Sequence, residues 1–390
     1  MSTSELESSA ATLRPGPART ATPGRRTPPV KAWALVGGLI LALIVVTLVR
    51  WVTGPLFHAV PSGPSEPPGW MKANLVFWQV VSPLAALAVF YAAVVRPWRR
   101  DRAIGLDGCF VLAFSTLWFW DPLCNYTGSW VTYNSWMINM GSWHASVPGS
   151  ASFAAPGQML AEPLLLIPPL YVYFFWLACM QGSWVMRRIS DRWPGAGRPA
   201  LIGGCFAVIF VFDFVLEGLI WMPGGAWTLA GGHLPVLFPG TYHQFTVNEL
   251  VPVSLTLTAV ACIRHFRDDR GRTIADRGID DLKVSSGRRQ AYRILAVTGA
   301  VHVTMFACYV LPNVFFGLHT QAWPADVQQR SYFTDYICGE GTDRACPGPA
   351  IPNLRNDNSA GGAQSAYVDR DGRLRVPPGA SIPAPVPFGP

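Results

Sequence analysis

The chain has 390 residues, of which 50% are hydrophobic and only 14% are charged, and its mean hydropathy is positive. Soluble domains usually carry about 25% charged residues, so this composition excludes an ordinary soluble domain and indicates a membrane protein. The formal net charge is +7, but the basic residues lie in short stretches between apolar segments. Such placement is typical of topology signals and argues against a nucleic-acid-binding protein.

The chain begins with a polar stretch and continues with long apolar runs. Residues 1–31 are rich in Pro, Ser, Thr and Arg, so they are predicted to form a disordered cytoplasmic N-terminus. A transmembrane helical domain is expected over residues 32–320, because its apolar runs are long enough to cross a bilayer. About seven spans are predicted, over residues 32–49, 73–95, 104–120, 160–180, 200–222, 244–263 and 291–312.

The distribution of basic residues orients these spans. Arg and Lys cluster in the stretches 96–102, 187–198 and 264–289, whereas the stretches 121–161 and 223–248 contain neither. Because cytoplasmic loops carry an excess of basic residues, the N-terminus is predicted to lie inside and the C-terminus outside. The expected fold class is therefore all-α, a multi-pass helical bundle in the cell membrane.

The loop 121–161 is predicted to be a folded exterior element, since long loops without structure of their own are uncommon. It is rich in aromatic and amide side chains. An interfacial aromatic belt is the alternative for its Trp residues taken singly, although a belt does not need the Asn residues. The candidate substrate-binding residues in this loop are Asn125, Tyr126, Tyr133, Asn134 and Trp143.

Acidic residues concentrate at the exterior ends of the apolar segments. Ionisable groups in or near a bilayer are costly, so this concentration indicates a functional site. Asp213 and Glu217 are four residues apart, which places both carboxyl groups on one helical face. Two adjacent anions repel, so one is expected to hold a proton near neutral pH, as general acid/base catalysis requires. The candidate catalytic residues are Asp213, Glu217, Glu249, Asp121 and Glu162.

Each of these carboxyl groups also has a structural alternative. Glu162 and Glu249 begin apolar segments, where an acidic residue in the first helical turn is favoured by the helix dipole. Asp121 precedes a proline, which suits a simple helix stop. Glu217 can reach the membrane interface while Asp213 bonds to a neighbouring Ser, Thr or Asn.

Two further residues are candidates for substrate binding. Tyr242 precedes Glu249, and His302 lies inside the last span, although a single buried His is more often a hydrogen-bonded packing residue. The Glu-x-x-His motif of di-iron helical bundles does not occur in the sequence, so neither a metal nor a cofactor is predicted.

The chain after the last span becomes polar and then rich in Pro and Gly. Residues 321–390 are therefore predicted to form an exterior tail that is mostly disordered. Cys338 and Cys346 flank a short Gly-containing loop, and a disulfide is expected between them if this segment lies outside the cytosol.

Several short motifs stand out, namely Trp120-Asp121-Pro122, Asn125-Tyr126, Tyr133-Asn134, Gly141-Ser142-Trp143 and Ala161-Glu162-Pro163. Together they resemble the AveC-like spirocyclase family of actinobacterial membrane proteins. Asp213 and Glu217 in one span, and Tyr242 and Glu249 near the next, also suit the pattern of that family. The resemblance covers roughly residues 32–320 and implies dehydration and spiroketal formation on a polyketide.

The resulting hypothesis is a membrane-embedded spirocyclase or dehydratase. It would use carboxyl groups for acid/base catalysis on a lipophilic hydroxy-ketone or polyketide-like small molecule, without a cofactor. The alternative is a non-enzymatic carrier of a lipid or small molecule, or an accessory membrane protein. Proton-coupled transport would need carboxyl groups that are reachable from both sides of the membrane. The sequence shows no acidic residues deep in the inner half of several helices, which counts mildly against transport. A seven-helix receptor rests on the helix count alone.

Overall fold

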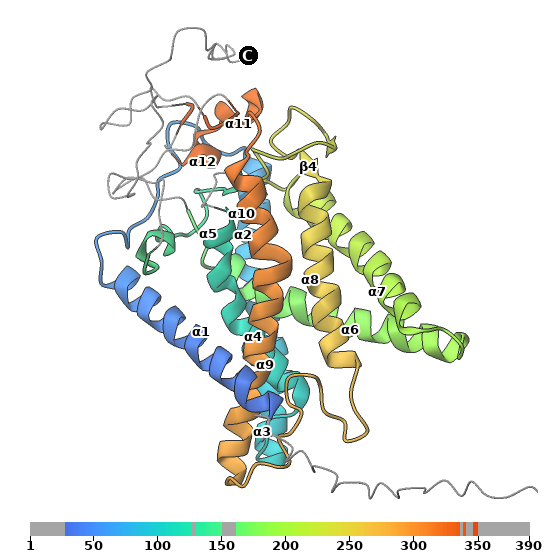
Figure 1. Cartoon of the computed structure of the whole chain (residues 1–390). Helices are drawn as coiled ribbons and strands as arrows, with labels where there is room; N and C mark the ends of the chain where they lie inside the picture. The colour runs from blue at the N-terminus through green and yellow to red at the C-terminus, as the bar shows by residue number, and fades with distance from the viewer. Residues whose placement is uncertain (1–27, 126–129, 150–160, 336–337, 341–345, 350–390) are drawn as a thin grey trace, which may run out of the picture.

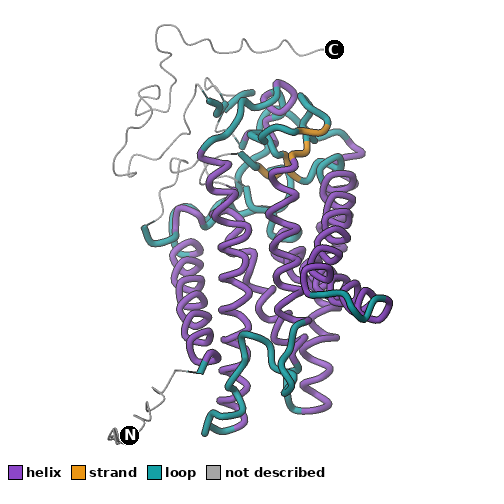
Figure 2. The backbone as a smooth tube through the Cα atoms, turned by 45° about the vertical axis from the view of Figure 1, so that its right-hand side comes forward, coloured by secondary structure: helices purple, strands orange, loops and turns teal. Residues whose placement is uncertain are grey.

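The computed structural model describes residues 28–125, 130–149, 161–335, 338–340 and 346–349. Long helices form a bundle, and loops, short helices and short strands gather over one of its ends (Figures 1 and 2). The expected all-α class is confirmed, because the described residues are mostly helical and the strands are only two residues long.

The bundle contains long helices that pass without interruption into π-helical stretches. Its helical elements are α1 (Pro29–Val52), α2 (Gly69–Phe90), η1 (Tyr91–Val95), α3 (Arg96–Asp101), α4 (Leu106–Leu117), η2 (Trp118–Trp120), α5 (Asp121–Asn125), α6 (Ile167–Arg192), α7 (Arg198–Asp213), η4 (Phe214–Trp221), α8 (Val247–His265), α9 (Ser286–Met305), η5 (Phe306–Val310) and α10 (Leu311–Leu318). Of these, η1, η4 and η5 are π-helical and η2 is a 3₁₀ turn.

Five helices among the described residues are long and apolar enough to cross a membrane. They are Pro29–Val52, Gly69–Asp101, Arg198–Trp221, Val247–His265 and Ser286–Leu318. The two other expected spans correspond to α4 and α6, which are not among the five. Helix α4 has only 12 residues. Helix α6 has 26 residues but is less apolar than α1. It begins at Ile167, with Pro168 and Pro169 in its first turn, where proline is tolerated. The count of seven spans therefore stays a prediction.

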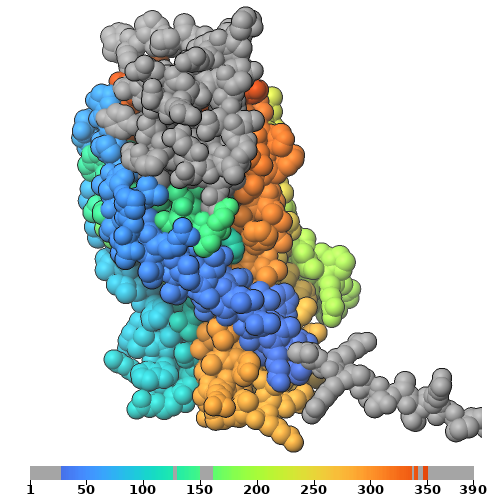
Figure 3. All heavy atoms as spheres, turned by 60° about the vertical axis from the view of Figure 1, so that its left-hand side comes forward, coloured from blue at the N-terminus to red at the C-terminus, as the bar shows by residue number. Residues whose placement is uncertain are grey.

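The five apolar helices differ in how much protein surrounds them. Only 22% of the most apolar window of α1 is buried, against 61% for α8. Figure 3 shows α1 lying diagonally across the outside of the bundle. It crosses α9 at Gly37, where an added Cβ atom would lie 2.0 Å from the backbone oxygen of Leu295, so only glycine permits this approach.

A cap covers the end of the bundle where α5 and α8 carry acidic residues. We define it as residues 130–149, 161–166, 222–246 and 319–335. It contains β1 (Thr132–Tyr133), η3 (His144–Ser146), β2 (Trp227–Thr228), β3 (Val236–Leu237), β4 (Phe245–Thr246, joined directly to α8), α11 (Ala325–Gln328) and α12 (Ser331–Thr334).

Backbone pairing joins the separate segments of the cap. Strands β1 and β2 pair antiparallel, with Tyr133 opposite Trp227, and β3 pairs with β4. The Thr132 hydroxyl donates to the backbone oxygen of Phe333 in α12 at 2.6 Å. Beyond α12, the predicted disulfide between Cys338 and Cys346 is present. The cap and the Arg-containing helix α3 lie at opposite ends of the molecule (Figure 1).

Candidate functional site

A cavity of about 70 Å³ lies between the helices beneath the cap. Four of the five predicted carboxyl groups line it, and each comes from a different element: Asp121 from α5, Asp213 from the end of α7, Glu217 from η4 and Glu249 from α8. All four residues are buried. No Lys, Arg or His is found among the described residues of its wall.

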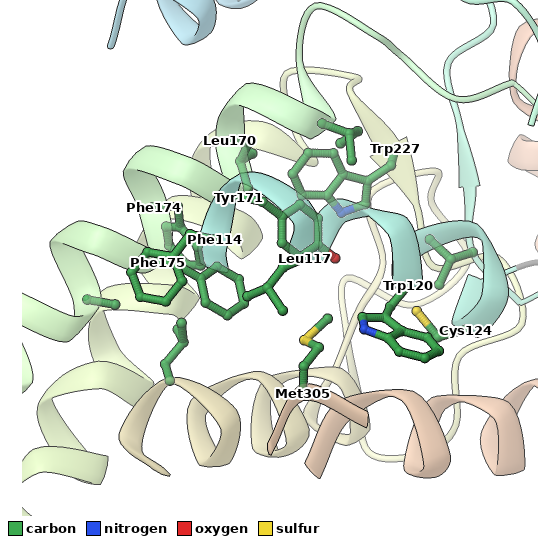
Figure 4. Close-up of a cluster of buried hydrophobic side chains, with 14 of the residues drawn as sticks. Phe114, Leu117, Trp120, Cys124, Leu170, Tyr171, Phe174, Phe175, Trp227 and Met305 are labelled. Carbon is green, nitrogen blue, oxygen red and sulfur yellow. The ribbon is translucent and has the colours of Figure 1, made fainter. Parts of the chain in front are cut away.

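Aromatic and aliphatic side chains form the rest of the wall. Figure 4 shows Tyr171, Phe174 and Phe175 side by side on α6, with Trp227 of β2 and Met305 of α9 nearby. The other wall residues are Asn125, Val131, Tyr133, Ile167, Leu170, Trp221, Leu229, Val253, Thr256 and Tyr309. The site is therefore an apolar chamber in which acidic groups are the dominant polar feature.

Asp121 receives hydrogen bonds from three different elements. Tyr133 donates its hydroxyl to Oδ2 at 2.6 Å, and Tyr171 donates its hydroxyl to Oδ1 at 2.7 Å. The amide of Asn125, one helical turn along α5, donates to Oδ2 at 2.9 Å. Donors directed at both oxygens stabilise the carboxylate anion. Burial nevertheless outweighs them and raises the pKa of Asp121 to about 6.

Glu162 lies against Asp121 and behind the cavity wall. The residue is fully buried, and neither of its carboxyl oxygens receives a hydrogen bond from an N–H or O–H group of the described residues. Burial and then the negative charge of Asp121 raise the pKa of Glu162 well above its ordinary value. The neighbouring Glu162 carboxyl in turn lowers the pKa of Asp121. Of the two groups, Asp121 is therefore the more easily ionised, and the protonated form is favoured more strongly at Glu162.

The other three carboxyl groups have fewer donors. Glu217 accepts from the indole N–H of Trp227 at 3.0 Å, and Glu249 accepts at Oε1 from the Tyr309 hydroxyl at 2.6 Å. Glu249 Oε2 and Asp213 Oδ2 are buried and have no hydrogen-bond partner among the described residues. Buried polar atoms are normally satisfied, so these two oxygens are free to bind hydroxyl groups of a ligand.

Two of the polar wall residues lie in π-helical stretches. Glu217 lies in η4 and Tyr309 in η5. A π-helical turn is wider than an α-helical turn and is found frequently at functional sites. Asp213 and Glu217 were expected on one helical face, and both line the same wall of the cavity. The π-helical turn between them was not indicated by the sequence.

His302 does not line the cavity, although it is a candidate substrate-binding residue in the sequence. The indole N–H of Trp120 donates to His302 Nδ1 at 2.8 Å, so the ring proton is on Nε2, which lies 2.9 Å from Thr116 Oγ1. Both ring nitrogens are therefore occupied by neighbouring helices. This arrangement corresponds to the hydrogen-bonded packing residue that was the alternative for this His.

Three other predicted binding residues do not line the cavity; Asn134 and Tyr242 join segments of the cap, and Trp143 joins the cap to η2. The Asn134 amide donates to the backbone oxygen of Gly225 at 2.9 Å, and the Trp143 indole donates to that of Phe119 at 2.9 Å. The Tyr242 hydroxyl donates to the backbone oxygen of Pro223 at 2.6 Å. Of the remaining candidates, Asn125 and Tyr133 lie in the wall, and Tyr126 lies outside the described residues.

Sequence reasoning missed the three residues Tyr171, Tyr309 and Trp227, which donate hydrogen bonds to Asp121, Glu249 and Glu217 respectively. Tyr171 and Tyr309 are hydroxyl-bearing residues within apolar runs, a feature that could have marked them. Trp227 lies in the stretch 223–248, which contains no Lys or Arg and was already assigned to the exterior side. Within the described part of the chain, no group of three or more His, Cys, Asp or Glu residues is arranged to hold a metal ion.

Asp335 connects the last segment of the cap to the acid pair. It is fully buried just after α12, and its Oδ2 accepts from the backbone N–H of Ala161, the residue before Glu162, at 3.0 Å. Burial raises the pKa of Asp335 to about 8. Because ionisation is then unfavourable in the folded state, its contribution to stability is complete below the unfolded pKa of about 4 and is lost as the pH rises through about 8.

The melting temperature of the protein is therefore expected to fall between pH 5 and pH 8. In an Asp335→Asn variant the melting temperature should fall less steeply with pH, because Asn still accepts from Ala161 but does not ionise. Each kcal/mol of unfolding free energy corresponds to a shift of about 2–4 °C in the melting temperature. Thermal unfolding in detergent at several pH values measures both slopes. Equal slopes for the variant and the wild type would show that Asp335 does not titrate in this range.

Comparison with known proteins gives one match. The sequence model of the AveC-like spirocyclase family matches residues 98–333, which is more than half of the chain. The matched region contains all four cavity carboxyl groups together with Glu162. No curated protein sequence and no solved structure matches the chain.

Proposed function

This chain belongs to the AveC-like spirocyclase family, and from that premise we propose that it is a membrane-embedded cyclase that uses carboxyl groups for acid/base catalysis. Its proposed substrate is a lipophilic, uncharged hydroxy-ketone of the polyketide type. The observation that carries the proposal is the convergence of four carboxyl groups from four elements on one aromatic cavity. The absence of Lys, Arg and His from the described wall supports an uncharged substrate, since an anion would meet only acidic groups there.

Ring closure of a keto-diol to a spiroketal needs two hydroxyl additions at one carbonyl carbon and the loss of one water. Each addition requires a base for the attacking hydroxyl, and water loss requires an acid for the departing hydroxyl. In the proposed mechanism Asp121, stabilised as an anion by three donors, accepts the proton of the attacking hydroxyl. Asp213 and Glu249 bind the reacting oxygens, and a carboxylic acid among them protonates the departing hydroxyl. The same acid and base would serve a simple dehydration.

The size of the cavity supports a site for the reacting centre alone. Pockets for whole drug-sized ligands usually measure roughly 300–1,000 Å³, whereas this cavity measures about 70 Å³. In the proposal it therefore encloses the carbonyl carbon and its neighbouring hydroxyl groups. A fixed ring-closing conformation within it would supply proximity and would exclude competing water.

Separate Asp213→Asn and Glu249→Gln variants test the proposal. Each is expected to lower the conversion of a synthetic keto-diol to its spiroketal by about 10²–10⁴-fold, because each removes a carboxyl group that can transfer a proton. Conversion is measured by mass spectrometry in membranes that contain the full chain, and unfolding curves establish that the variants are folded.

Asp269→Asn is the matched control, since Asp269 is exposed and lies at the Arg-rich end. Wild-type conversion by both cavity variants would overturn the catalytic role. Binding of the keto-diol by the wild-type protein without any conversion would instead favour a carrier.

A further inference from the structure

A second feature of the molecule lies outside the cavity, on the α6–α7 hairpin (Figure 1). An open groove of about 530 Å³ lies between the C-terminal part of α6 and the middle of α7. We propose that this groove binds an anionic phospholipid from the leaflet at the Arg-rich end of the bundle. Its wall consists of Trp184, Val185, Arg188, Ile189, Asp191, Arg192, Trp193 and Val208.

The two guanidinium groups of the groove have no acidic ion-pair partner among the described residues. None of the ion pairs within the described part of the chain includes Arg188 or Arg192. In contrast, Arg264 and Arg293, elsewhere in the protein, bond to carboxylates at 2.8 and 3.0 Å. The planar donor fork of Arg matches the oxygens of a phosphate group. A phosphodiester would therefore supply the hydrogen-bond acceptors and the negative charge for these two guanidinium groups.

Charge around the groove favours an anion. Asp191 also lines the groove, but the stretch 187–198 contains four Arg residues against this one acidic residue. Basic pockets between transmembrane helices are typical sites for anionic lipid headgroups.

Two exposed Trp side chains place the groove at a membrane interface. Trp184 is 51% exposed and Trp193 is 60% exposed. Each is near one guanidinium, with Arg188 Cζ 5.5 Å from the Trp184 ring and Arg192 Cζ 6.0 Å from the Trp193 ring. Trp residues are enriched at the level of the lipid headgroups, because their rings are amphipathic and can contact both the acyl chains and the polar headgroups.

An apolar stripe continues from the groove along α7 and η4. Val208, which lines the groove, is 37% exposed, and Val211, Val215 and Leu219 follow it at intervals of three or four residues with exposures of 60%, 40% and 47%. Residues at such intervals lie on one side of a helix. A ligand with both a phosphate and acyl chains fits this combination, whereas a free phosphate would leave the stripe unused.

Native mass spectrometry of the full chain in detergent tests the proposal with dioleoyl phosphatidylglycerol and dioleoyl phosphatidylcholine as probes. The wild-type protein is expected to retain phosphatidylglycerol preferentially. An Arg188→Gln/Arg192→Gln variant should bind it about 30-fold more weakly, since each basic residue contributes about 1 kcal/mol of attraction to an anionic surface. An Arg96→Gln/Arg99→Gln variant is the matched control, because both residues are exposed and carry the same charge outside the groove.

A Val208→Trp variant fills the groove without changing its charge and is also expected to lose phosphatidylglycerol. Retention equal to wild type in both groove variants would overturn the proposal. An equal loss in the control pair would also overturn it, since binding would then follow net charge. Soluble glycerol 1-phosphate is expected to leave phosphatidylglycerol retention unchanged, and competition by it would indicate a site for free phosphate.

Discussion

Replacement of Asp121 by Asn is expected to lower turnover by about 10²–10⁴-fold while the protein stays folded. Asn has nearly the same size. Tyr133 and Tyr171 donate to different oxygens of Asp121, so the single carbonyl oxygen of Asn keeps one of these bonds, and the other hydroxyl can rotate to accept from the Asn NH2 group. The variant lacks the anion that would take a proton from the attacking hydroxyl. Because a buried charge is removed, its melting temperature should be no lower than that of the wild type.

Conversion of the keto-diol and thermal unfolding are measured on the same preparation, with Asp269→Asn beside it. A variant that converts the substrate at the wild-type rate would contradict the role of Asp121 as base. A folded variant without activity would separate that role from a purely structural one. The distinction matters because Asp121 also holds Asn125, Tyr133 and Tyr171 in place.

The second large effect concerns the pH profile and Glu162. If Asp121 is the base, kcat/KM should fall about tenfold per pH unit below its pKa of about 6. A Glu162→Gln variant is expected to keep this acidic limb of the pH profile nearly in place, since the Gln amide can donate to Asp121 as a protonated carboxyl group would. A Glu162→Leu variant removes the donor, and a hydrogen bond to a charged group is worth about 1.5–3 kcal/mol, so the limb should move upward by about 1–2 pH units.

The pH dependence of kcat/KM between pH 4.5 and 9 measures these shifts. The diagnostic result is which variant shifts the pH at which kcat/KM falls. If Glu162 were merely structural, both variants would have lower rates, and kcat/KM would fall at the same pH as in the wild type. A downward shift of the limb in Glu162→Leu would show that Glu162 is ionised in the wild-type protein. That outcome would contradict the stronger preference of Glu162 for its protonated form.

The proposed chemistry and the proposed lipid site lie in different parts of the molecule. The acidic cavity lies beneath the cap, whereas the groove with Arg188 and Arg192 lies on the α6–α7 hairpin. Helix α7 connects them, since Val208 lines the groove and Asp213 at the end of the same helix lines the cavity. A lipid in the groove would therefore contact the helix that carries one of the proposed catalytic groups.

The amino-acid sequence by itself determined the class of the protein and the identity of its acidic groups. Apolar runs of sufficient length are a local property, so the helical class and five membrane-compatible helices could be predicted from them. The acidic residues stood out for a similar reason, because a carboxyl group in an apolar stretch is costly wherever the stretch folds. The four-residue spacing of Asp213 and Glu217 also predicted that they share one helical side, and both line the cavity although the turn between them is π-helical.

Only the tertiary structure decided which groups meet. Tyr171 donates to Asp121 from 50 residues away, and Tyr309 reaches Glu249 from 60 residues away. The pairing of β1 with β2 sets Tyr133 beside Trp227, and no local pattern encodes that register. Such contacts depend on how helices cross and how loops pair, which single-sequence periodicity does not contain. The same long-range packing turned His302 toward Trp120 and Thr116 and away from the cavity.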